Sequence, residues 1–249
     1  MPRFFVPTDN FDGDTVKITG DDARHISRAL RMAKGDHITV CDMKGVEHDC
    51  VLCDFFEDEC VTAKILSSEK SQNEPPYRVW LYQGSPKGDK IEYIVQKAVE
   101  LGVYGIVPFI SDRCVSRPDE KSAQKKAERL SKIAKEAAKQ CGRACLPEVG
   151  EYLTYEKMLK CASEAELKLF FYEGEGTESL RDILCKAKNS GNPPRSISIV
   201  IGSEGGFSIE ETKKAEAYGF VLCGLGKRIL RTETASGCVL SCLMYEFEM

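Results

Sequence analysis

The stretch ISIVIGSEGGFSIEETKKAEAYGFVLCGLGKRILRTETA, residues 197–235, decides the fold class. Residues 197–201 and 221–225 are short apolar runs, which predict two buried strands. Between them, Ser208 is followed three residues later by Glu211, the capping-box pattern that begins a helix. Strand, helix and strand in this order favour an α/β domain with a mostly parallel sheet. Ligands of such sheets bind beyond the carboxyl ends of the strands.

The same alternation of strands and helices extends toward the amino terminus. Further strands are predicted at residues 79–82, 106–110 and 167–172. Asp89 and Glu92 repeat the capping-box spacing and predict a second helix start. Residues 119–141 carry an alanine-rich apolar stripe, which predicts a long helix that ends at a glycine.

A polar segment, residues 67–76, lacks periodicity and ends in two prolines, which predicts a linker. We therefore expect two domains, residues 1–73 and residues 74–249. The first domain is predicted to be mostly β, because residues 37–41 and 61–65 alternate with period two.

Basic residues gather in two places. Arg24, Arg28 and Arg31 are spaced four and three apart, which puts them on one face of a predicted helix. Residues 113–143 hold ten Lys and Arg against four Asp and Glu. Exposed arginines and lysines in this pattern suit contact with an RNA backbone. A solvated helix face explains the arginine row about equally well, and it is the commoner explanation of residues 113–143.

The composition is that of an ordinary globular protein, with 42% hydrophobic and 30% charged residues and a net charge of −4. No secretory signal and no membrane-spanning apolar run is recognisable, so we expect a cytoplasmic protein. The twelve cysteines are scattered, and Cys50 with Cys53 forms the only C-x-x-C pair. This pattern predicts reduced thiols packed as small hydrophobes and no metal site.

Two glycine-containing loops follow the predicted strands of the opening stretch, at residues 201–207 and 224–234. The first loop has neither the dinucleotide fingerprint nor the P-loop pattern, and Glu204 would repel a phosphate. Its glycines instead suit a flat ligand that approaches the backbone closely, such as an adenosine that carries a positive sulfonium. Two tight turns without a ligand are the alternative.

The second loop brings Arg228, Arg231 and Glu233 together before a predicted helix that begins near Thr234. These residues predict either an ion pair or a group that orients a nucleobase or its phosphate.

Six segments of the chain, in order, resemble one family. The strings IGSEGGFS and LGKRILRTETA near the carboxyl terminus look like the signature of the ribosomal RNA small subunit methyltransferase E family. SPKGDKIEYIVQKAVELGV and EAAKQCGR resemble its middle region, and MPRFFV with HISRALRMAKGD resembles its amino-terminal domain. Ser203 and Lys227 depart from the family pattern, which usually has proline at both positions.

The resemblance implies a fold and a reaction that periodicity does not show. The carboxyl-terminal domain is expected to be a SPOUT-type α/β domain with a trefoil knot, and the amino-terminal domain a PUA-like β-barrel that binds RNA. The expected cofactor is S-adenosylmethionine, and the expected protein is a homodimer. The expected substrate is a single uridine of 16S ribosomal RNA in the small ribosomal subunit, methylated at N3.

Site residues follow from the motif match. The expected cofactor pocket consists of Phe171, Ile201, Gly202, Gly205, Leu225, Gly226, Ile229 and Leu230. Arg231 is expected to orient or stabilise the uridine anion, with Glu204 and Glu233 as candidate proton acceptors or orienting groups. RNA contacts are expected from Arg3, His25, Arg28, Arg31, Lys87, Gln140 and Arg143.

Two other functions remain open at this point. A sister enzyme of the same class would methylate another base or a ribose 2′-hydroxyl. A non-catalytic RNA-binding protein with a decayed cofactor site is the second alternative, for which Ser203 and Lys227 speak.

Overall fold

The protein is described by a computed structural model that covers residues 1–56 and 59–249. The chain forms two compact units. The first unit comprises Met1–Glu74 and Ala138–Leu146, and the second comprises Pro75–Ala137 and Pro147–Met249. The segment at 138–146 therefore returns to the first unit, which a division of the chain at residue 73 does not anticipate.

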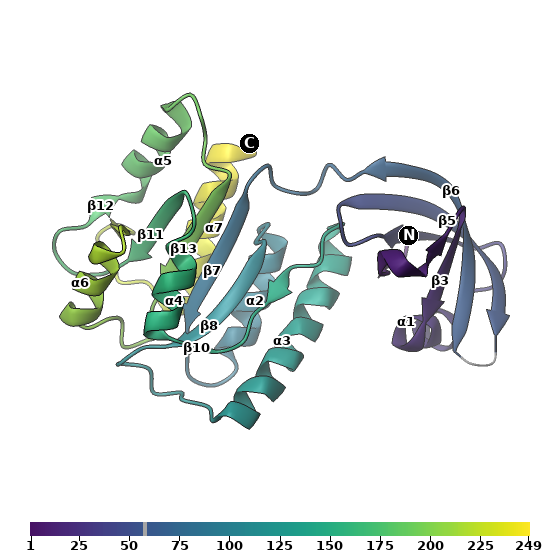
Figure 1. Ribbon diagram of the computed structural model, residues 1–249, viewed down its shortest axis with the longest axis horizontal. Coiled ribbons are helices and arrows are strands. Elements are labelled where there is room, and N and C mark those ends of the chain that lie inside the picture. The colour runs from purple at the N-terminus through teal and green to yellow at the C-terminus, as the bar shows by residue number, and fades with distance from the viewer. Residues whose placement is uncertain (57–58) are drawn as a thin grey trace. The chain divides into compact units, whose positions relative to one another are not determined.

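The first unit is built on a six-stranded sheet with the order β1-β4-β5-β6-β3-β2 (Figure 1). The strands are β1 (Arg3–Phe5), β2 (Phe11–Asp12), β3 (Thr15–Thr19), β4 (His37–Cys41), β5 (Val46–Phe56) and β6 (Cys60–Lys70). All pairs are antiparallel except β1 with β4. The register of β5 with β6 shifts twice, and such irregularities bend strands, so this long pair curls over its core.

Short helices interrupt the strands of the first unit: η1 (Thr8–Asn10), α1 (Gly20–Arg24) and the π-helical turn η2 (His25–Ala29). Ile26 of η2 is fully buried and packs into the core between the strands. The expectation of one regular helix through Arg31 was wrong, because the helix ends at Ala29 and Arg31 has a left-handed backbone with φ of 51°.

The second unit contains a parallel sheet with the order β10-β8-β7-β13-β11-β14-β12, in which β9 also pairs with β8. The strands are β7 (Arg78–Gly84), β8 (Gly105–Ile110), β9 (Glu148–Val149), β10 (Leu153–Thr154), β11 (Leu167–Phe171), β12 (Glu178–Ser179), β13 (Ser196–Ile201) and β14 (Val221–Gly224). The prediction of a mostly parallel α/β sheet is confirmed.

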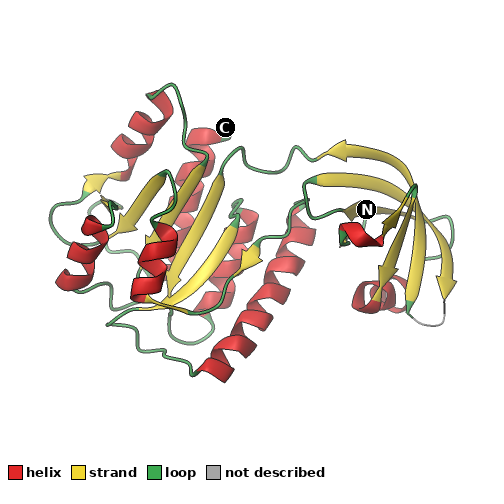
Figure 2. Cartoon of the chain, in the orientation of Figure 1, coloured by secondary structure: helices red, strands yellow, loops and turns green. Residues whose placement is uncertain are grey.

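Helices cover both faces of this sheet, as Figures 1 and 2 show. They are α2 (Lys90–Glu100), α3 (Glu120–Cys141), α4 (Tyr155–Ala162), α5 (Leu180–Asn189), α6 (Ile209–Ala217) and α7 (Thr232–Phe247). Helices α4 and α6 pack on the face that buries Phe170 and Val200, and α7 packs with α2 and α5 on the other. No helix among the described residues is long and apolar enough to cross a membrane.

The two predicted capping boxes have different outcomes. Ser208 and Glu211 form the reciprocal pair at the start of α6, as predicted. Asp89 precedes α2 without a side-chain cap, and Glu92 instead pairs with Arg129 of α3 at 2.9 Å. Because all strands run parallel, the loops after β7, β11, β13 and β14 leave the sheet at one edge, where ligands of such sheets bind.

Candidate cofactor and RNA site

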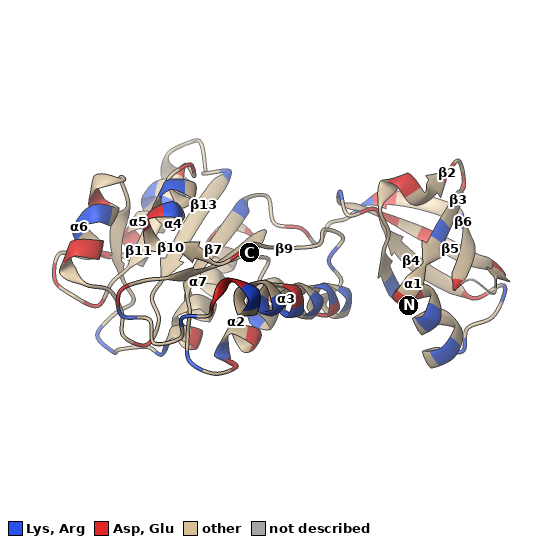
Figure 3. Ribbon diagram, turned by 60° about the horizontal axis from the view of Figure 1, so that its bottom comes forward, with Lys and Arg blue, Asp and Glu red and all other residues tan. Residues whose placement is uncertain are grey.

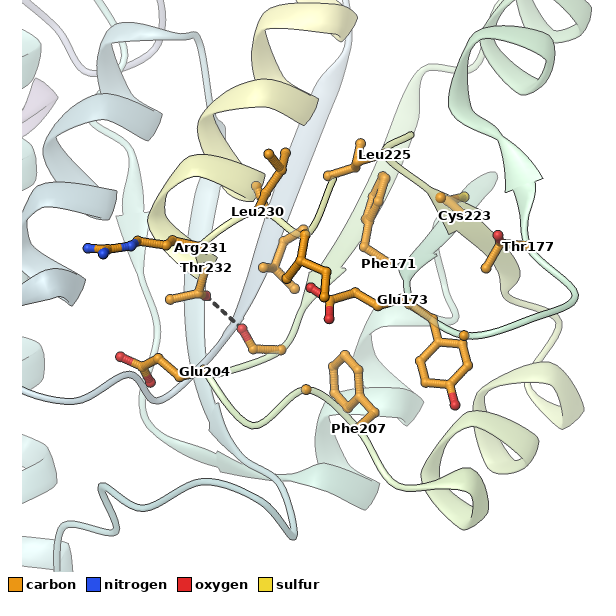
Figure 4. Close-up of a pocket in the computed structure, with 18 of the residues that line it drawn as sticks. Phe171, Glu173, Thr177, Glu204, Phe207, Cys223, Leu225, Leu230, Arg231 and Thr232 are labelled. Carbon is orange, nitrogen blue, oxygen red and sulfur yellow. Dashed lines mark hydrogen bonds between the residues drawn. The ribbon is translucent and has the colours of Figure 1, made fainter. Parts of the chain in front are cut away.

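A cavity of about 690 Å³ lies at the carboxyl edge of the parallel sheet (Figure 4). Its wall is formed mainly by three loops, which follow β11, β13 and β14 and comprise residues 171–177, 201–207 and 223–232. A cavity of this size matches those that hold small organic cofactors.

All eight residues that were expected to form a cofactor pocket line this one cavity: Phe171, Ile201, Gly202, Gly205, Leu225, Gly226, Ile229 and Leu230. The structure thus brings together residues that are up to 59 positions apart in the sequence. Figure 4 shows Phe171, Leu225 and Leu230 around one side of the cavity, where they offer an apolar surface for a flat ring.

The first loop is anchored by Phe207, which is 2% exposed. Its ring centroid lies 4.3 Å from that of Phe170 and 6.2 Å from that of Phe109, so the loop end is fixed to the core of the sheet. A Cβ at Gly202 would lie 3.0 Å from the Phe207 ring and 3.2 Å from the Gly206 Cα. Only glycine therefore leaves this turn undistorted.

Gly205 has a second close neighbour. A Cβ there would lie 2.9 Å from both the Cβ and the carbonyl oxygen of Arg113, and Arg113 also donates to the Gly205 carbonyl at 3.3 Å. The absence of a side chain at Gly205 thus lets the first loop lie directly against the β8–α3 connection.

A buried hydrogen-bond network joins the first loop to the start of α7. Gln83 at the end of β7 is fully buried, and its Nε2 donates to Thr232 Oγ1 at 2.8 Å. Thr232 Oγ1 in turn donates to the Gly202 carbonyl at 2.6 Å, the dashed line in Figure 4. This network, which we call the loop lock, consists of Gln83, Thr232 and Gly202 and holds two walls of the cavity in register.

The sequence did not identify the loop lock, and of the third loop of the cavity it identified only Phe171. Glu173 and Thr177 lie on the wall formed after β11, and Figure 4 shows the Glu173 side chain extending into the cavity. The available signal was the glycine-containing string YEGEGT directly after a predicted strand, at the same edge as the other two loops.

The three candidate catalytic residues are divided between two depressions. Arg231 and Glu204 line the large cavity, whereas Glu233 lines a neighbouring depression with Lys90. Figure 4 shows Arg231 and Glu204 pointing away from the aromatic wall. Within the described part of the chain, the exposed Arg231 guanidinium has no hydrogen-bond or ion-pair partner, so it is available to a ligand.

Glu204 is already engaged by the protein. Lys90 Nζ lies 2.8 Å from its carboxylate, and the Lys87 backbone N–H donates to both carboxylate oxygens at 3.2 and 3.3 Å. Partial burial alone would raise the pKa of Glu204, but these contacts outweigh it and hold the pKa below its ordinary value. A carboxylate with a lowered pKa is a weaker proton acceptor than a free one.

The expected RNA contacts fall into two groups. His25, Arg28, Arg31 and Gln140 are exposed in the first unit, and Lys87 is exposed in the second. Figure 3 also shows lysines and arginines along α3. Arg28 lies 3.9 Å from Glu59, and its side chain remains 76% exposed.

Arg3 and Arg143 are held inside the first unit instead. Arg143 is 4% exposed and its guanidinium contacts Glu74 at 2.7 Å, while the same carboxylate accepts the backbone N–H groups of Ala144 and Cys145. Arg3 pairs with Glu47 at 2.9 Å and also donates to the Arg143 carbonyl. These contacts tie the segment at 138–146 to the first unit, so both arginines have a structural role here.

The cysteines form no disulfide in the structure, and no group of three or more His, Cys, Asp or Glu residues in the described ranges is arranged for a metal ion. Cys50 of the C-x-x-C pair is buried in the core of the first unit, and burial raises its pKa to about 12. Cys50 is therefore a protonated thiol packed as a small apolar group in this core.

Comparison with known proteins agrees with this architecture. Residues 73–244 match the model of the RNA methyltransferase domain family. The chain is 35% identical over 252 residues to the ribosomal RNA small subunit methyltransferase E of Bacillus subtilis, with 100% of this chain and 98% of that protein covered. The corresponding enzyme of Synechocystis is 33% identical, with 94% and 74% covered.

Solved structures give the same result. The ribosomal RNA small subunit methyltransferase E of Neisseria gonorrhoeae bound to S-adenosylmethionine superposes with a TM-score of 0.83, at 33% identity over 98% of this chain and 97% of that one. A putative methyltransferase of Legionella pneumophila in complex with the same cofactor gives 0.83, at 30% identity over 98% and 96%. The chain thus belongs to the ribosomal RNA small subunit methyltransferase E family.

Proposed function

We propose that this protein transfers a methyl group from S-adenosylmethionine to N3 of one uridine in 16S ribosomal RNA of the small ribosomal subunit. The observation that carries the proposal is the convergence of the eight expected pocket residues on one cavity, whose position corresponds to the edge where parallel sheets bind ligands. Relatives that share the fold over almost the whole chain bear names for this class of reaction.

The cavity fits the proposed cofactor in shape and charge. Phe171, Leu225 and Leu230 offer apolar contact to an adenine ring, and the missing side chains of Gly202 and Gly205 let the loop after β13 pack closely as part of the wall. Glu173 adds a carboxylate to the wall, which suits a ligand that carries positive charge and repels a phosphate. When bound, S-adenosylmethionine would supply the electrophilic methyl group.

The protein's own contribution is to prepare the uracil. N3 carries a weakly acidic imide proton, and its loss leaves an anion that must be stabilised. Arg231, exposed and unpaired within residues 1–56 and 59–249, is proposed to stabilise this anion and to orient the base. Glu233 is the better of the two candidate proton acceptors, because Lys90 lies 3.5 Å from it but 2.8 Å from Glu204, which also accepts the Lys87 N–H. The base must be unpaired or turned out of its stack, since N3 is normally used in pairing.

RNA is proposed to bind the exposed residues His25, Arg28, Arg31, Lys87 and Gln140, with Arg3 and Arg143 left out because the first unit engages them. The family resemblance supports three further proposals: a PUA-like RNA-binding domain at residues 1–73, a knotted SPOUT methyltransferase domain at residues 74–249, and a homodimer. Because the proposed substrate is the ribosomal subunit, the proposed place of action is the cytoplasm.

The decisive test supplies small subunits from a strain that lacks the modification, together with labelled S-adenosylmethionine. Nuclease digestion and mass spectrometry then locate the methyl group. A methyl group on uridine N3 is the expected result. Transfer to another base or to a ribose 2′-hydroxyl would replace the proposed target, and cofactor binding without transfer would point to a different RNA. Absence of both would favour a non-catalytic RNA-binding protein.

The proposed RNA surface has its own test. Replacement of Arg28 with Ala should weaken binding to the small subunit and reduce the slope of log K against log salt by about one, because one phosphate contact is lost. Lys34, exposed in the same unit and paired with Asp54 at 3.1 Å, provides the control substitution, Lys34→Ala. An unchanged slope for Arg28→Ala would show that Arg28 is surface charge only.

A further inference from the structure

Lys90, the first residue of α2, lies between the two candidate carboxylates. Its Nζ is 2.8 Å from Glu204 in the loop after β13 and 3.5 Å from Glu233 in the first turn of α7. The Lys87 N–H, three residues earlier, donates to the same Glu204 carboxylate. The start of α2 thus contacts the loop after β13, which lines the large cavity, and the first turn of α7, which lines the neighbouring depression.

Both carboxylates pair with this one ammonium group. Glu204 and Glu233 are 30% and 18% exposed, so water screens their mutual repulsion less than it would at an open surface. Glu233 Oε2 is buried without a hydrogen-bond partner in the described residues, so the charge of Lys90 is its compensation there. Contacts with both carboxylates also raise the pKa of Lys90, the hydrogen bond to Glu204 being the largest contribution.

We propose that Lys90 is a positioning residue, which holds Glu204 and Glu233 at a fixed separation and thereby keeps the two cofactor loops in binding-competent positions. This inference rests on the proposed function, because the measured quantity is affinity for S-adenosylmethionine. It gives Glu204 the role of an anchor for the β7–α2 connection, in place of a proton acceptor. Loss of the cation leaves two carboxylates that repel each other, and the loops separate.

The test is Lys90→Met, which keeps the length and apolar character of the side chain and removes its charge. The dissociation constant for S-adenosylmethionine, measured by calorimetry, should rise about three- to tenfold, because the variant loses a partly shielded ion-pair network. Lys97→Met is the matched control, because Lys97 lies on the same helix, is similarly exposed and pairs with Glu100 of its own helix. Its dissociation constant should equal that of the unmodified protein.

A second substitution separates a charge effect from a packing effect. Glu204→Gln combined with Lys90→Met removes the repulsion between the two carboxylates, so the double variant should recover most of the lost affinity for S-adenosylmethionine. Lys90→Arg keeps the positive charge and should keep the affinity of the unmodified protein. Equal affinity of Lys90→Met and the unmodified protein would overturn the inference. Lost affinity without recovery in the double variant would also overturn it, because the apolar part of Lys90 would then carry the effect.

The outcome also distinguishes the inference from the proposed function. Failure of the unmodified protein to bind S-adenosylmethionine would refute the proposed function. The Lys90 bridge is then judged by the double-mutant cycle of Lys90→Met and Glu204→Gln in urea unfolding. A coupling between the two positions supports the bridge, and additive effects refute it.

Discussion

Thr232→Val provides the sharpest test of the loop lock. Thr232 is 5% exposed, and its hydroxyl accepts from Gln83 and donates to the Gly202 carbonyl. Valine has nearly the same shape, so the substitution removes both hydrogen bonds without opening a cavity. The Gly202 carbonyl keeps only the longer contact from Gln83 Nε2 at 3.4 Å.

The expected loss follows from the two buried groups that are left poorly satisfied. Each such group costs about 1–3 kcal/mol, and the remaining contacts of Gln83 with Gly84 and Gly202 reduce the total to about 2–3 kcal/mol. In a protein of this size, 1 kcal/mol corresponds to about 2–4 °C, so the melting temperature should fall by about 4–12 °C. Affinity for S-adenosylmethionine should fall as well, because the lock joins two walls of its proposed cavity.

Thermal and urea unfolding measure the stability, and calorimetry measures the affinity. The control is Thr234→Val, two residues along the same helix, where the threonine is exposed and its hydroxyl has no hydrogen bond within the described ranges. Its stability should change by less than about 0.5 kcal/mol. If Thr232→Val costs no more than this control, the lock does not stabilise the site and the reasoning fails.

Three further predictions concern the reaction, the loop packing and the thiols. Arg231→Ala should lower methyl transfer at least about a hundredfold while cofactor affinity stays within about threefold, as single-turnover and binding measurements would reveal; loss of binding instead would contradict its role toward the uridine. Gly205→Ala should destabilise the protein by about 1–3 kcal/mol in urea unfolding, because the new Cβ meets Arg113, and unchanged stability would contradict the close packing. At pH 8, iodoacetamide should label the exposed Cys161 first, as mass spectrometry would show. Cys41, Cys50 and Cys223 are among the buried thiols. Burial raises their pKa to about 11 or 12, so they stay protonated and unreactive at pH 8. Early labelling of these three thiols would contradict their burial.

Local patterns in this sequence predicted local structure reliably. The strands and the α6 capping box depend on neighbouring residues, so periodicity and spacing reveal them. The Asp89–Glu92 pattern has the same spacing but no cap, because Glu92 pairs with Arg129, 37 positions away. A tertiary partner thus changed the outcome of a pattern that looks identical in the sequence.

Charged residues of the candidate catalytic and RNA-binding sites show more clearly that local patterns do not reveal distant partners. Arg143 and Arg3 were predicted to contact RNA, yet their partners Glu74 and Glu47 are 69 and 44 positions away and could not be paired from spacing. Glu204 was a candidate proton acceptor until the structure brought Lys90 to it from 114 positions away. The eight apolar and glycine residues named by the motif match all line the cavity, because that motif describes backbone shape and does not depend on a distant ion pair. The match missed other lining residues, such as Gly174, Gly206 and Phe207.

Ser203 illustrates what a departure from the family motif means in physical terms. The turn that it begins is intact, because the Gly206 N–H donates to the Ser203 carbonyl at 3.0 Å. Ser203 is also 6% exposed, and its backbone nitrogen packs against Gly84, where a Cβ would lie only 2.6 Å away. Tertiary contacts therefore hold the loop in place without proline. Proline stabilises mainly by restricting the unfolded chain, typically by about 0.4–1 kcal/mol, so serine at this position forgoes that contribution to stability.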